Sequence, residues 1–103
     1  MVAAVKPFRF GVQSRNMGPR ETWLASVRRI EALGYSSVSW ADHLVNGLDP
    51  VASLAAAAIA TEHLRLTSFV FDNDFRHPAV LAMSAGTIDI LSGGRLELGI
   101  GAG

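Results

Sequence analysis

Residues 91–103, Leu-Ser-Gly-Gly-Arg-Leu-Glu-Leu-Gly-Ile-Gly-Ala-Gly, are the stretch that decides the fold of this chain. Their order predicts a helix that ends at Leu91, a stop at Gly93-Gly94 and a strand from Arg95 to Ile100. The strand finishes in the alternating glycines of Gly99–Gly103, and a glycine-rich strand end is typical of the start of a ligand-binding loop. We therefore expect a strand whose carboxyl end approaches a ligand.

The same alternation of helix and strand extends back through the chain. Apolar residues alternate or cluster in three earlier segments, which predicts strands at residues 8–13, 35–40 and 64–71. Between these strands, Pro19, Asp49-Pro50 and Pro78 are typical first-turn residues of helices. The run at 64–71 is so rich in apolar residues that we expect it to be buried on both faces.

A β-α-β-α-β-α-β order with no hairpin predicts parallel strands joined by right-handed crossovers. Two α/β architectures fit this order: an open doubly wound sheet, and a partial TIM (β/α)8 barrel. Four strands and three helices are somewhat under half of a barrel, which normally takes about 250 residues. We expect residues 1–103 to form a single incomplete (β/α)-barrel domain.

Composition excludes several classes of protein. The chain has 103 residues, of which 50% are hydrophobic and 17% are charged, and its nine basic and nine acidic residues cancel. The balanced charge argues against a nucleic-acid partner or an anionic membrane surface. The absence of cysteine excludes disulfides and thiolate chemistry. Since no apolar run approaches the length of a membrane span, we expect a cytoplasmic location.

Polar residues follow the predicted strands where a parallel sheet would gather them at one rim. The strand ends are Gln13-Ser14, Ala41-Asp42-His43, Phe71-Asp72-Asn73 and Gly99–Gly103. His43 could donate or accept a proton near neutral pH, and the neighbouring carboxylate of Asp42 could orient it or bind a hydroxyl group. The alternative is a capped turn that happens to contain a histidine.

Other motifs indicate less specific chemistry. The glycines of Gly99–Gly103 lack the spacing of a dinucleotide or P-loop motif. Asp72-Asn73-Asp74 offers oxygen ligands, but the glycine and glutamate of a calcium loop are missing, so we interpret it as a polar loop and expect no metal site. Arg76 is available to an anion, and His77 precedes Pro78 as a helix-entry residue.

Taken together, these segments resemble the luciferase-like monooxygenase family, within it the branch that uses the deazaflavin coenzyme F420. The most specific segment is Ile88–Arg95 running into Leu98–Gly103. The other matching segments occur in the expected order: Phe10-Gly11-Val12-Gln13, Glu31-Ala32-Leu33-Gly34-Tyr35, Trp40-Ala41-Asp42-His43 and Arg76-His77-Pro78-Ala79. The resemblance covers the whole chain, but only the N-terminal portion of the family's fold.

The resemblance implies a (β/α)8 barrel with an isoalloxazine-type ring at its carboxyl-end mouth. It places Asp42 and His43 beside the ring and assigns proton transfer or charge stabilisation to His43. It implies a non-proline cis peptide at Ser68-Phe69, in a bulge behind the ring, and contact with the cofactor from Gly101 and Gly103. The implied activity is hydride transfer between coenzyme F420, or alternatively FMN, and a small organic substrate.

Two other interpretations stay open beside this one. A partial barrel would leave two sheet edges and an apolar inner face uncovered, so we expect a homo-oligomer. On this view the chain could be a truncated, non-catalytic, self-associating piece of such an enzyme, because the sequence stops where the ligand loop should begin. An open-sheet nucleotide-binding domain is disfavoured, since Ser14–Gly18 offers only one glycine for a phosphate loop.

Overall fold

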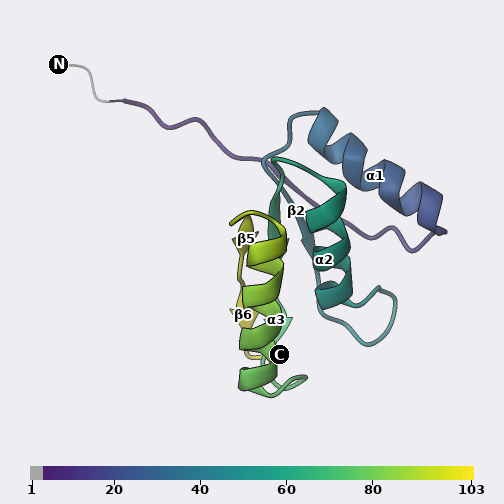
Figure 1. Cartoon of the computed structure of the whole chain (residues 1–103), viewed down its shortest axis with the longest axis vertical. Helices are drawn as coiled ribbons and strands as arrows, with labels where there is room; N and C mark the ends of the chain where they lie inside the picture. Colours follow the sequence, from purple (N-terminus) through teal and green to yellow (C-terminus); the bar gives the residue numbers. More distant parts are fainter. Residues whose placement is uncertain (1–3) are drawn as a thin grey trace.

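Strands and helices alternate along the chain, as the sequence pattern predicts. The computed structural model describes residues 4–103. In chain order the elements are β1 (Gly11–Gln13), α1 (Arg20–Ala32), β2 (Ser37–Trp40), α2 (Pro50–Ala60), β3 (Arg65–Ser68), β4 (Phe71–Asp72), α3 (Pro78–Leu91), β5 (Leu96–Glu97) and β6 (Ile100–Gly101). Figure 1 shows the three helices and residues 4–8, which extend away from the rest of the molecule.

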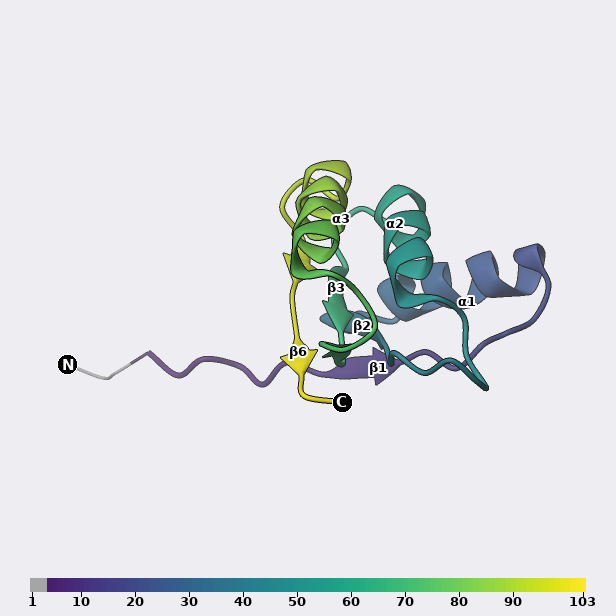
Figure 2. The ribbon, with the colours of Figure 1, turned by 90° about the horizontal axis from the view of Figure 1, so that it is seen from below.

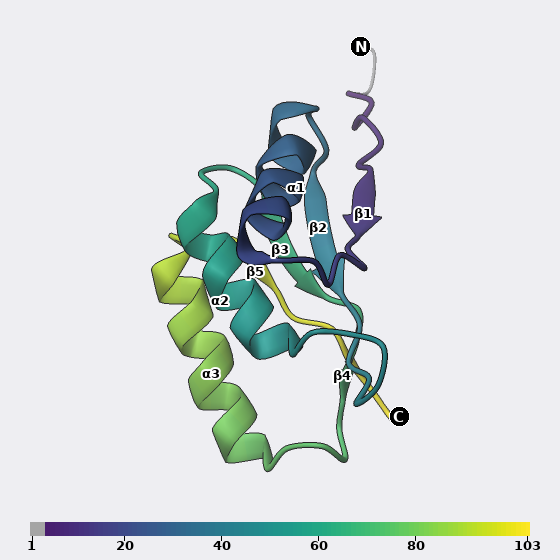
Figure 3. The same cartoon turned by 90° about the vertical axis from the view of Figure 1, so that its right-hand side faces the viewer.

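The strands form two small sheets in which all pairs are parallel. The larger sheet has the order β1-β2-β3-β5, and β4 pairs with β6 in the second. Each pair is parallel, so the predicted parallel sheet is confirmed. The helices all cover one face of the strands, and the other face is open (Figures 2 and 3). Within residues 4–103 no helix is long and apolar enough to cross a membrane.

The core lies between the larger sheet and the helices. Side chains of β2 and β3 that point toward the helices are buried, among them Val38, Trp40 and Leu66. They belong to the same cluster as buried residues of the helices, which include Trp23, Val27, Leu54, Ala57 and Ile88. The rings of Trp23 and Trp40 stack with their centroids 5.8 Å apart, which fixes α1 against the end of β2.

Helix ends coincide with the residues that the sequence analysis singled out. Asp49 caps α2 by accepting a hydrogen bond from the Ala52 amide, at 2.8 Å. His77 caps α3, where its Nδ1 accepts from the Ala79 amide at 3.1 Å. At the other end of α3, Gly93 and Gly94 have φ angles of 67° and 83°, which few side chains adopt. The predicted helix at 78–91 is therefore confirmed.

The third and fourth predicted strands are each interrupted in the middle, which the sequence analysis missed. A non-proline cis peptide between Phe69 and Val70 separates β3 from β4, whereas the resemblance implied this bond one residue earlier, at Ser68-Phe69. Phe69 and Val70 are 63% and 40% exposed, so the prediction of a run buried on both faces is wrong. Only the side chains directed toward the helices, such as Leu66, are enclosed.

The first two strands are shorter than predicted. β1 begins at Gly11, and Phe8 and Phe10 before it are exposed. Tyr35 lies outside β2, because its backbone amide bonds to the Ile30 carbonyl at the end of α1. Pairing between β1 and β2 starts at Gly11 and Ser37, and just before it the Ser36 amide donates to the Phe10 carbonyl at 2.8 Å.

The open face of the larger sheet is polar, and the expectation of an uncovered apolar inner face is wrong. Strand residues alternate in direction, and those that point away from the helices are mainly polar: Gln13, Ser37, Ser39, Arg65, Thr67 and Glu97. The Glu97 carboxylate accepts from Arg9 at 2.7 Å and from Arg65 at 3.1 Å. Burial alone would raise the pKa of Glu97, but these two arginines outweigh it and lower that pKa.

Two further polar contacts fasten the loop between α2 and β3. The Glu31 carboxylate of α1 accepts hydrogen bonds from the backbone amides of Glu62, His63 and Leu64. The buried guanidinium of Arg95 donates to backbone carbonyls at the end of α2, with Ala58 at 2.7 Å. A cation at this position satisfies carbonyls that the helix leaves unpaired and complements the helix dipole.

Candidate functional site

The carboxyl ends of the strands converge on one pocket of about 810 Å³. It is lined by the ends of β1, β2, β4 and β6 and by the loops that follow β1 and β2. Gln13, Asp42, His43, Asp72 and Gly101 all line it, so the predicted gathering of strand-end residues at one rim is confirmed. Asn73, which was expected at the same rim, is not among the lining residues.

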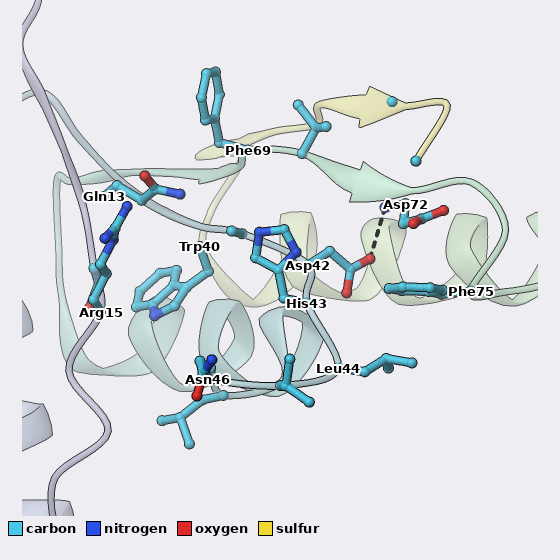
Figure 4. Close-up of a pocket in the computed structure, with 18 of the residues that line it drawn as sticks. Gln13, Arg15, Trp40, Asp42, His43, Leu44, Asn46, Phe69, Asp72 and Phe75 are labelled. Carbon is cyan, nitrogen blue, oxygen red and sulfur yellow. Dashed lines mark hydrogen bonds between the residues drawn. The ribbon is translucent and has the colours of Figure 1, made fainter.

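Asp42 lies at the edge of this pocket with its carboxylate turned toward other protein groups. Both of its oxygens accept hydrogen bonds from the Arg76 guanidinium, and the Arg76 Nη2 to Asp42 Oδ1 distance is 3.0 Å. Asp42 Oδ2 also accepts from the backbone amide of Asp72 at 2.9 Å (Figure 4). The side chain of Asp42 is only 4% exposed, so its oxygens are already occupied by protein donors.

Electrostatics keep this ion pair charged. Burial would raise the pKa of the Asp42 carboxyl, but hydrogen bonds from Arg76 and from the Asp72 amide outweigh burial and lower that pKa. The hydrogen bond to Asp42 likewise raises the pKa of Arg76. A carboxylate so stabilised is a poor proton donor or acceptor near neutral pH, which argues against a direct role in proton transfer.

His43 has the opposite environment from its neighbour. Its imidazole is exposed and lines the pocket. Within residues 4–103 no hydrogen bond joins it to Asp42, so the expectation that Asp42 orients His43 through its carboxylate is not met. Figure 4 shows the two side chains directed differently, the carboxylate toward Asp72 and the imidazole into the pocket. His43 is therefore a histidine that a ligand in the pocket can reach, and Arg15 and Asp72 line the same pocket.

Ser68 lies close to the pocket but does not line it. It is fully buried, and its hydroxyl donates to the Gly99 carbonyl and accepts from the Gly99 amide, both at 2.8 Å. Ser68 is absent from the residues that line the pocket, so its predicted contact with a cofactor is replaced by a role in holding the two broken strands together. Phe69 and Val70 of the adjacent bulge do line the pocket.

The glycines of the last strand leave space that any side chain would fill. A Cβ atom added to Gly101 would lie 2.6 Å from Val70 Cγ2. A Cβ atom added to Gly103, whose φ is 102°, would lie 3.0 Å from both carboxylate oxygens of Asp72. Both glycines line the pocket, so the strand end predicted to approach a ligand does border the cavity.

Arg76 is the main participant that reasoning from the sequence missed. The sequence showed that it was available to an anion, but the anion is Asp42 of this same chain. Val70 is the second, since the bulge was placed one residue too early. The side chains of Asp42 and Arg76 come from segments 34 residues apart, one following β2 and the other following β4.

The pocket combines an apolar wall with a polar rim. Phe69 and Val70 expose apolar surface to it, and Gly101 leaves room beside them. Gln13, at the carboxyl end of β1, and His43, after the carboxyl end of β2, supply polar groups to the rim (Figure 4). A flat aromatic ring system with polar edges fits such a wall, since exposed apolar side chains cover its face and polar groups meet its edge. No group of three acidic or histidine side chains suited to a metal occurs within residues 4–103.

Comparison with known proteins agrees with this geometry. The model of the luciferase-like monooxygenase family matches residues 1–103. An F420-dependent glucose-6-phosphate dehydrogenase of Intrasporangium calvum is 41% identical over 98 residues, which cover 87% of this chain and 29% of that protein. The 4-hydroxyprotoasukamycin monooxygenase of Streptomyces nodosus is 33% identical over 78 residues, covering 72% of this chain and 21% of that protein.

Solved structures with the same arrangement include enzymes of both cofactor types. The coenzyme F420-dependent tetrahydromethanopterin reductase of Methanopyrus kandleri superposes with a TM-score of 0.82 at 26% identity, covering 92% of this chain and 27% of that one. The oxygenating constituent of 3,6-diketocamphane monooxygenase from Pseudomonas putida, in complex with FMN, has a TM-score of 0.81 at 25% identity, covering 94% of this chain and 30% of that one.

These curated relatives and solved structures are much longer than this chain, which spans about 21–30% of their length. The parallel β/α arrangement accordingly covers part of a TIM-barrel fold. With a family match over residues 1–103, and with strand order and strand-end pocket in agreement, the chain belongs to the luciferase-like monooxygenase family.

Proposed function

We propose that this chain contributes to the cofactor site of an oxidoreductase that moves a hydride between coenzyme F420, or alternatively FMN, and a small organic substrate. The observation that carries the proposal is the pocket at the carboxyl ends of the strands. It places an exposed histidine, His43, at the same cavity as the apolar bulge of Phe69 and Val70 and the glycine strand end. The relatives named above use both deazaflavin and flavin cofactors, which supports either.

The residues present fit such a cofactor. The bound deazaflavin or flavin would supply the ring that accepts or donates the hydride. Val70 and Phe69 would support one face of the ring, and the absence of a side chain at Gly101 and Gly103 would allow it to approach the backbone. An apolar wall of this kind excludes water, which strengthens the electrostatic interactions inside the site.

His43 is the residue that we assign to proton transfer. Its imidazole is exposed in the pocket and is not held by another side chain within residues 4–103, so it is free to donate or accept a proton at a bound substrate. Asp42 cannot share this task, because its carboxylate is enclosed and bonded to Arg76. We therefore assign Asp42 to the support of the loop that carries His43.

Titration of the purified chain with coenzyme F420 and, separately, with FMN tests the proposal. Binding is followed by cofactor fluorescence, and we expect a dissociation constant in the micromolar range for one of the two. Arg28→Gln is the control, because Arg28 is exposed on α1 outside the pocket. A folded chain that binds neither cofactor at millimolar concentration would refute the proposal.

The assignment of His43 is tested separately, with the bound cofactor and a reducing or oxidising substrate. His43→Ala should lower turnover far more than it weakens cofactor binding, since the imidazole moves a proton and does not hold the ring. Equal losses in turnover and in affinity would assign His43 to binding alone.

We also propose that copies of this chain associate, and α3 is the surface that supports it. Its solvent-facing side carries Val80, Met83 and Ile90 at 57%, 76% and 82% exposure, and small residues lie between them. Asp89 is the one charged residue of this helix. An exposed apolar strip of this kind favours contact with another apolar surface. The open sheet face, being polar, does not offer such a contact.

A further inference from the structure

The loop between β2 and α2, residues 43–48, forms one wall of the pocket and has no polar support of its own. All six of its residues line the pocket. Within the described part of the chain, the hydrogen bonds that involve this stretch lie at its two ends, on Asp42 and Asp49, and not on residues 43–48. Leu44 and Val45 are 82% and 71% exposed, so apolar contacts do not hold the loop either.

Arg76 joins the two ends of this loop. Its guanidinium donates to both carboxylate oxygens of Asp42, which precedes the loop, and its Nη2 lies 3.5 Å from Oδ1 of Asp49, which follows it. The other carboxylate oxygen of Asp49 caps α2. A single arginine on the segment after β4 therefore connects the end of β2, the start of α2 and its own loop.

The guanidinium is itself held in place from a third direction. Its Cζ atom lies 5.0 Å from the centroid of the buried Phe71 ring, in a cation–π arrangement. The Arg76 side chain is only 16% exposed, and that of Asp42 only 4%. Charge-assisted, two-pronged contacts in such a partly enclosed setting are stronger and more directional than surface ion pairs.

From this arrangement we infer that Arg76 is a positioning residue for the pocket, acting through Asp42. It holds the base of the 43–48 loop closed, and this fixes where His43 and the apolar residues of the loop stand in relation to the bulge at Phe69. A lysine could supply the charge but not the planar fork that reaches Asp42 and Asp49 together. The consequence for ligand binding rests on the function proposed above, whereas the effect on the loop does not.

The loop itself gives the first test, with no cofactor present. Chymotrypsin cleaves after leucine, and cleavage after Leu44 and Leu48 becomes faster as the loop moves away from the body of the protein. We expect Arg76→Gln and Asp42→Asn each to raise the cleavage rate at these sites at least tenfold under native conditions, and Arg76→Lys to fall between them and the unsubstituted chain. Asp49→Asn, which keeps a cap for α2 but loses the weaker contact, should change the rate about two- to threefold.

Three comparisons separate positioning from a general loss of stability. Cleavage after Leu66, which is fully buried in β3, reports on unfolding of the whole chain and should not change in Arg76→Lys. The double variant Asp42→Asn with Arg76→Gln should be cleaved no faster than Arg76→Gln alone, because that substitution already removes the contact with Asp42. Arg28→Gln, on the surface of α1, should behave as the unsubstituted chain. Additive effects of the two substitutions, or parallel increases after Leu66 and Leu44, would overturn the inference.

The second test measures coenzyme F420 affinity by fluorescence in the same variants. Arg76→Gln should weaken binding at least tenfold, and Arg76→Lys should recover part of the loss. If the unsubstituted chain binds neither F420 nor FMN, the proposed function fails, while the cleavage rates still decide the role of Arg76. If F420 binds equally well to Arg76→Gln and to the unsubstituted chain, the positioning role at the site is refuted.

Discussion

The hydroxyl of Ser68 and the backbone of Gly99 hold each other by two reciprocal hydrogen bonds of 2.8 Å. They join β3 to the segment between β5 and β6, at the point where both strands are interrupted. A Cβ atom at Gly99 would lie 2.4 Å from the Ser68 carbonyl oxygen. The close approach and the paired hydrogen bonds together fix the end of β3 against Gly99, next to the residues that line the pocket.

Gly99→Ala should therefore destabilise the chain. The methyl group would meet a backbone atom that no side-chain rotation can move, and overpacking of this kind costs about 1–3 kcal/mol. Chemical denaturation monitored by tryptophan fluorescence would measure the loss. Gly86→Ala is the matched control: nothing lies within 4 Å of that added atom, and alanine in the α3 interior should increase stability by about 1 kcal/mol. Equal stability of the two variants would contradict the role of Gly99.

Removal of the Ser68 hydroxyl tests the same junction from the other side. Ser68→Ala leaves the Gly99 amide without its partner in a partly buried position, whereas the Gly99 carbonyl keeps the hydrogen bond from the Phe71 amide. A lost hydrogen bond of this kind costs about 1–3 kcal/mol. The free energy of unfolding should fall by this amount. Ser26→Ala provides a comparison, since the Ser26 hydroxyl bonds only to a carbonyl within its own helix.

Glu31 should make stability depend on acid pH. Burial would raise its pKa, but hydrogen bonds from the His63, Leu64 and Glu62 amides outweigh burial and lower that pKa below the ordinary value of 4.5. A carboxyl with a lowered pKa in the folded state stabilises the protein fully above its unfolded pKa, and this contribution is lost as the pH falls through the folded value. Thermal unfolding between pH 7 and pH 3 would record the loss.

Glu31→Gln should reduce that dependence. The carboxylate of Glu31 accepts hydrogen bonds from three backbone amides through two oxygens, whereas the glutamine side chain has only one acceptor oxygen. The variant should therefore be less stable at pH 7 by about 1–2 kcal/mol. As the pH falls through the lowered pKa of Glu31 in the folded chain, the variant and the unsubstituted chain should converge. A constant difference across the whole pH range would show that the charge of Glu31 does not contribute.

Gly101→Ala should separate ligand binding from stability. The added methyl group would lie 2.6 Å from a Val70 methyl, which a rotation of that side chain can relieve, so the free energy of unfolding should change by less than about 1 kcal/mol. The same methyl group narrows the cavity beside the bulge. We expect affinity for coenzyme F420 to fall at least tenfold in a fluorescence titration, and unchanged affinity would place the ring elsewhere.

Met83→Glu tests association through α3. A charge in the centre of the exposed apolar strip should convert a multimeric chain into a monomer, as measured by multi-angle light scattering at micromolar concentration. Ala25→Glu places the same charge on the exposed side of α1 and should leave the mass unchanged. If the unsubstituted chain is already monomeric at this concentration, the proposed association is refuted.

Much of the fold could be predicted from local residue types. Pro78 and Gly93-Gly94 bracket α3, and the helix has the predicted bounds because proline and glycine act within a few residues of their own position. The strand interruptions could not be predicted in this way. Residues 64–71 form one apolar run, and the break depends on Ser68 meeting Gly99, which lies in a different part of the chain.

The candidate site was predicted in position but not in its contacts. Parallel strand order alone gathers Asp42, His43 and Gly101 at one rim, and the structure confirms this. The partner of Asp42 could not be predicted, because an isolated Arg76 in a loop gives no indication of which carboxylate it will meet. The contact with Arg76 encloses the Asp42 carboxylate, and His43 beside it remains accessible.

The three charged side chains on the open sheet face lie outside the pocket. Arg9 precedes β1, Arg65 begins β3 and Glu97 belongs to β5, so their contacts tie together strands that are not all neighbours. These ion pairs and the pocket therefore share no residue. Substitutions among the residues that line the pocket should leave the contacts between these strands intact.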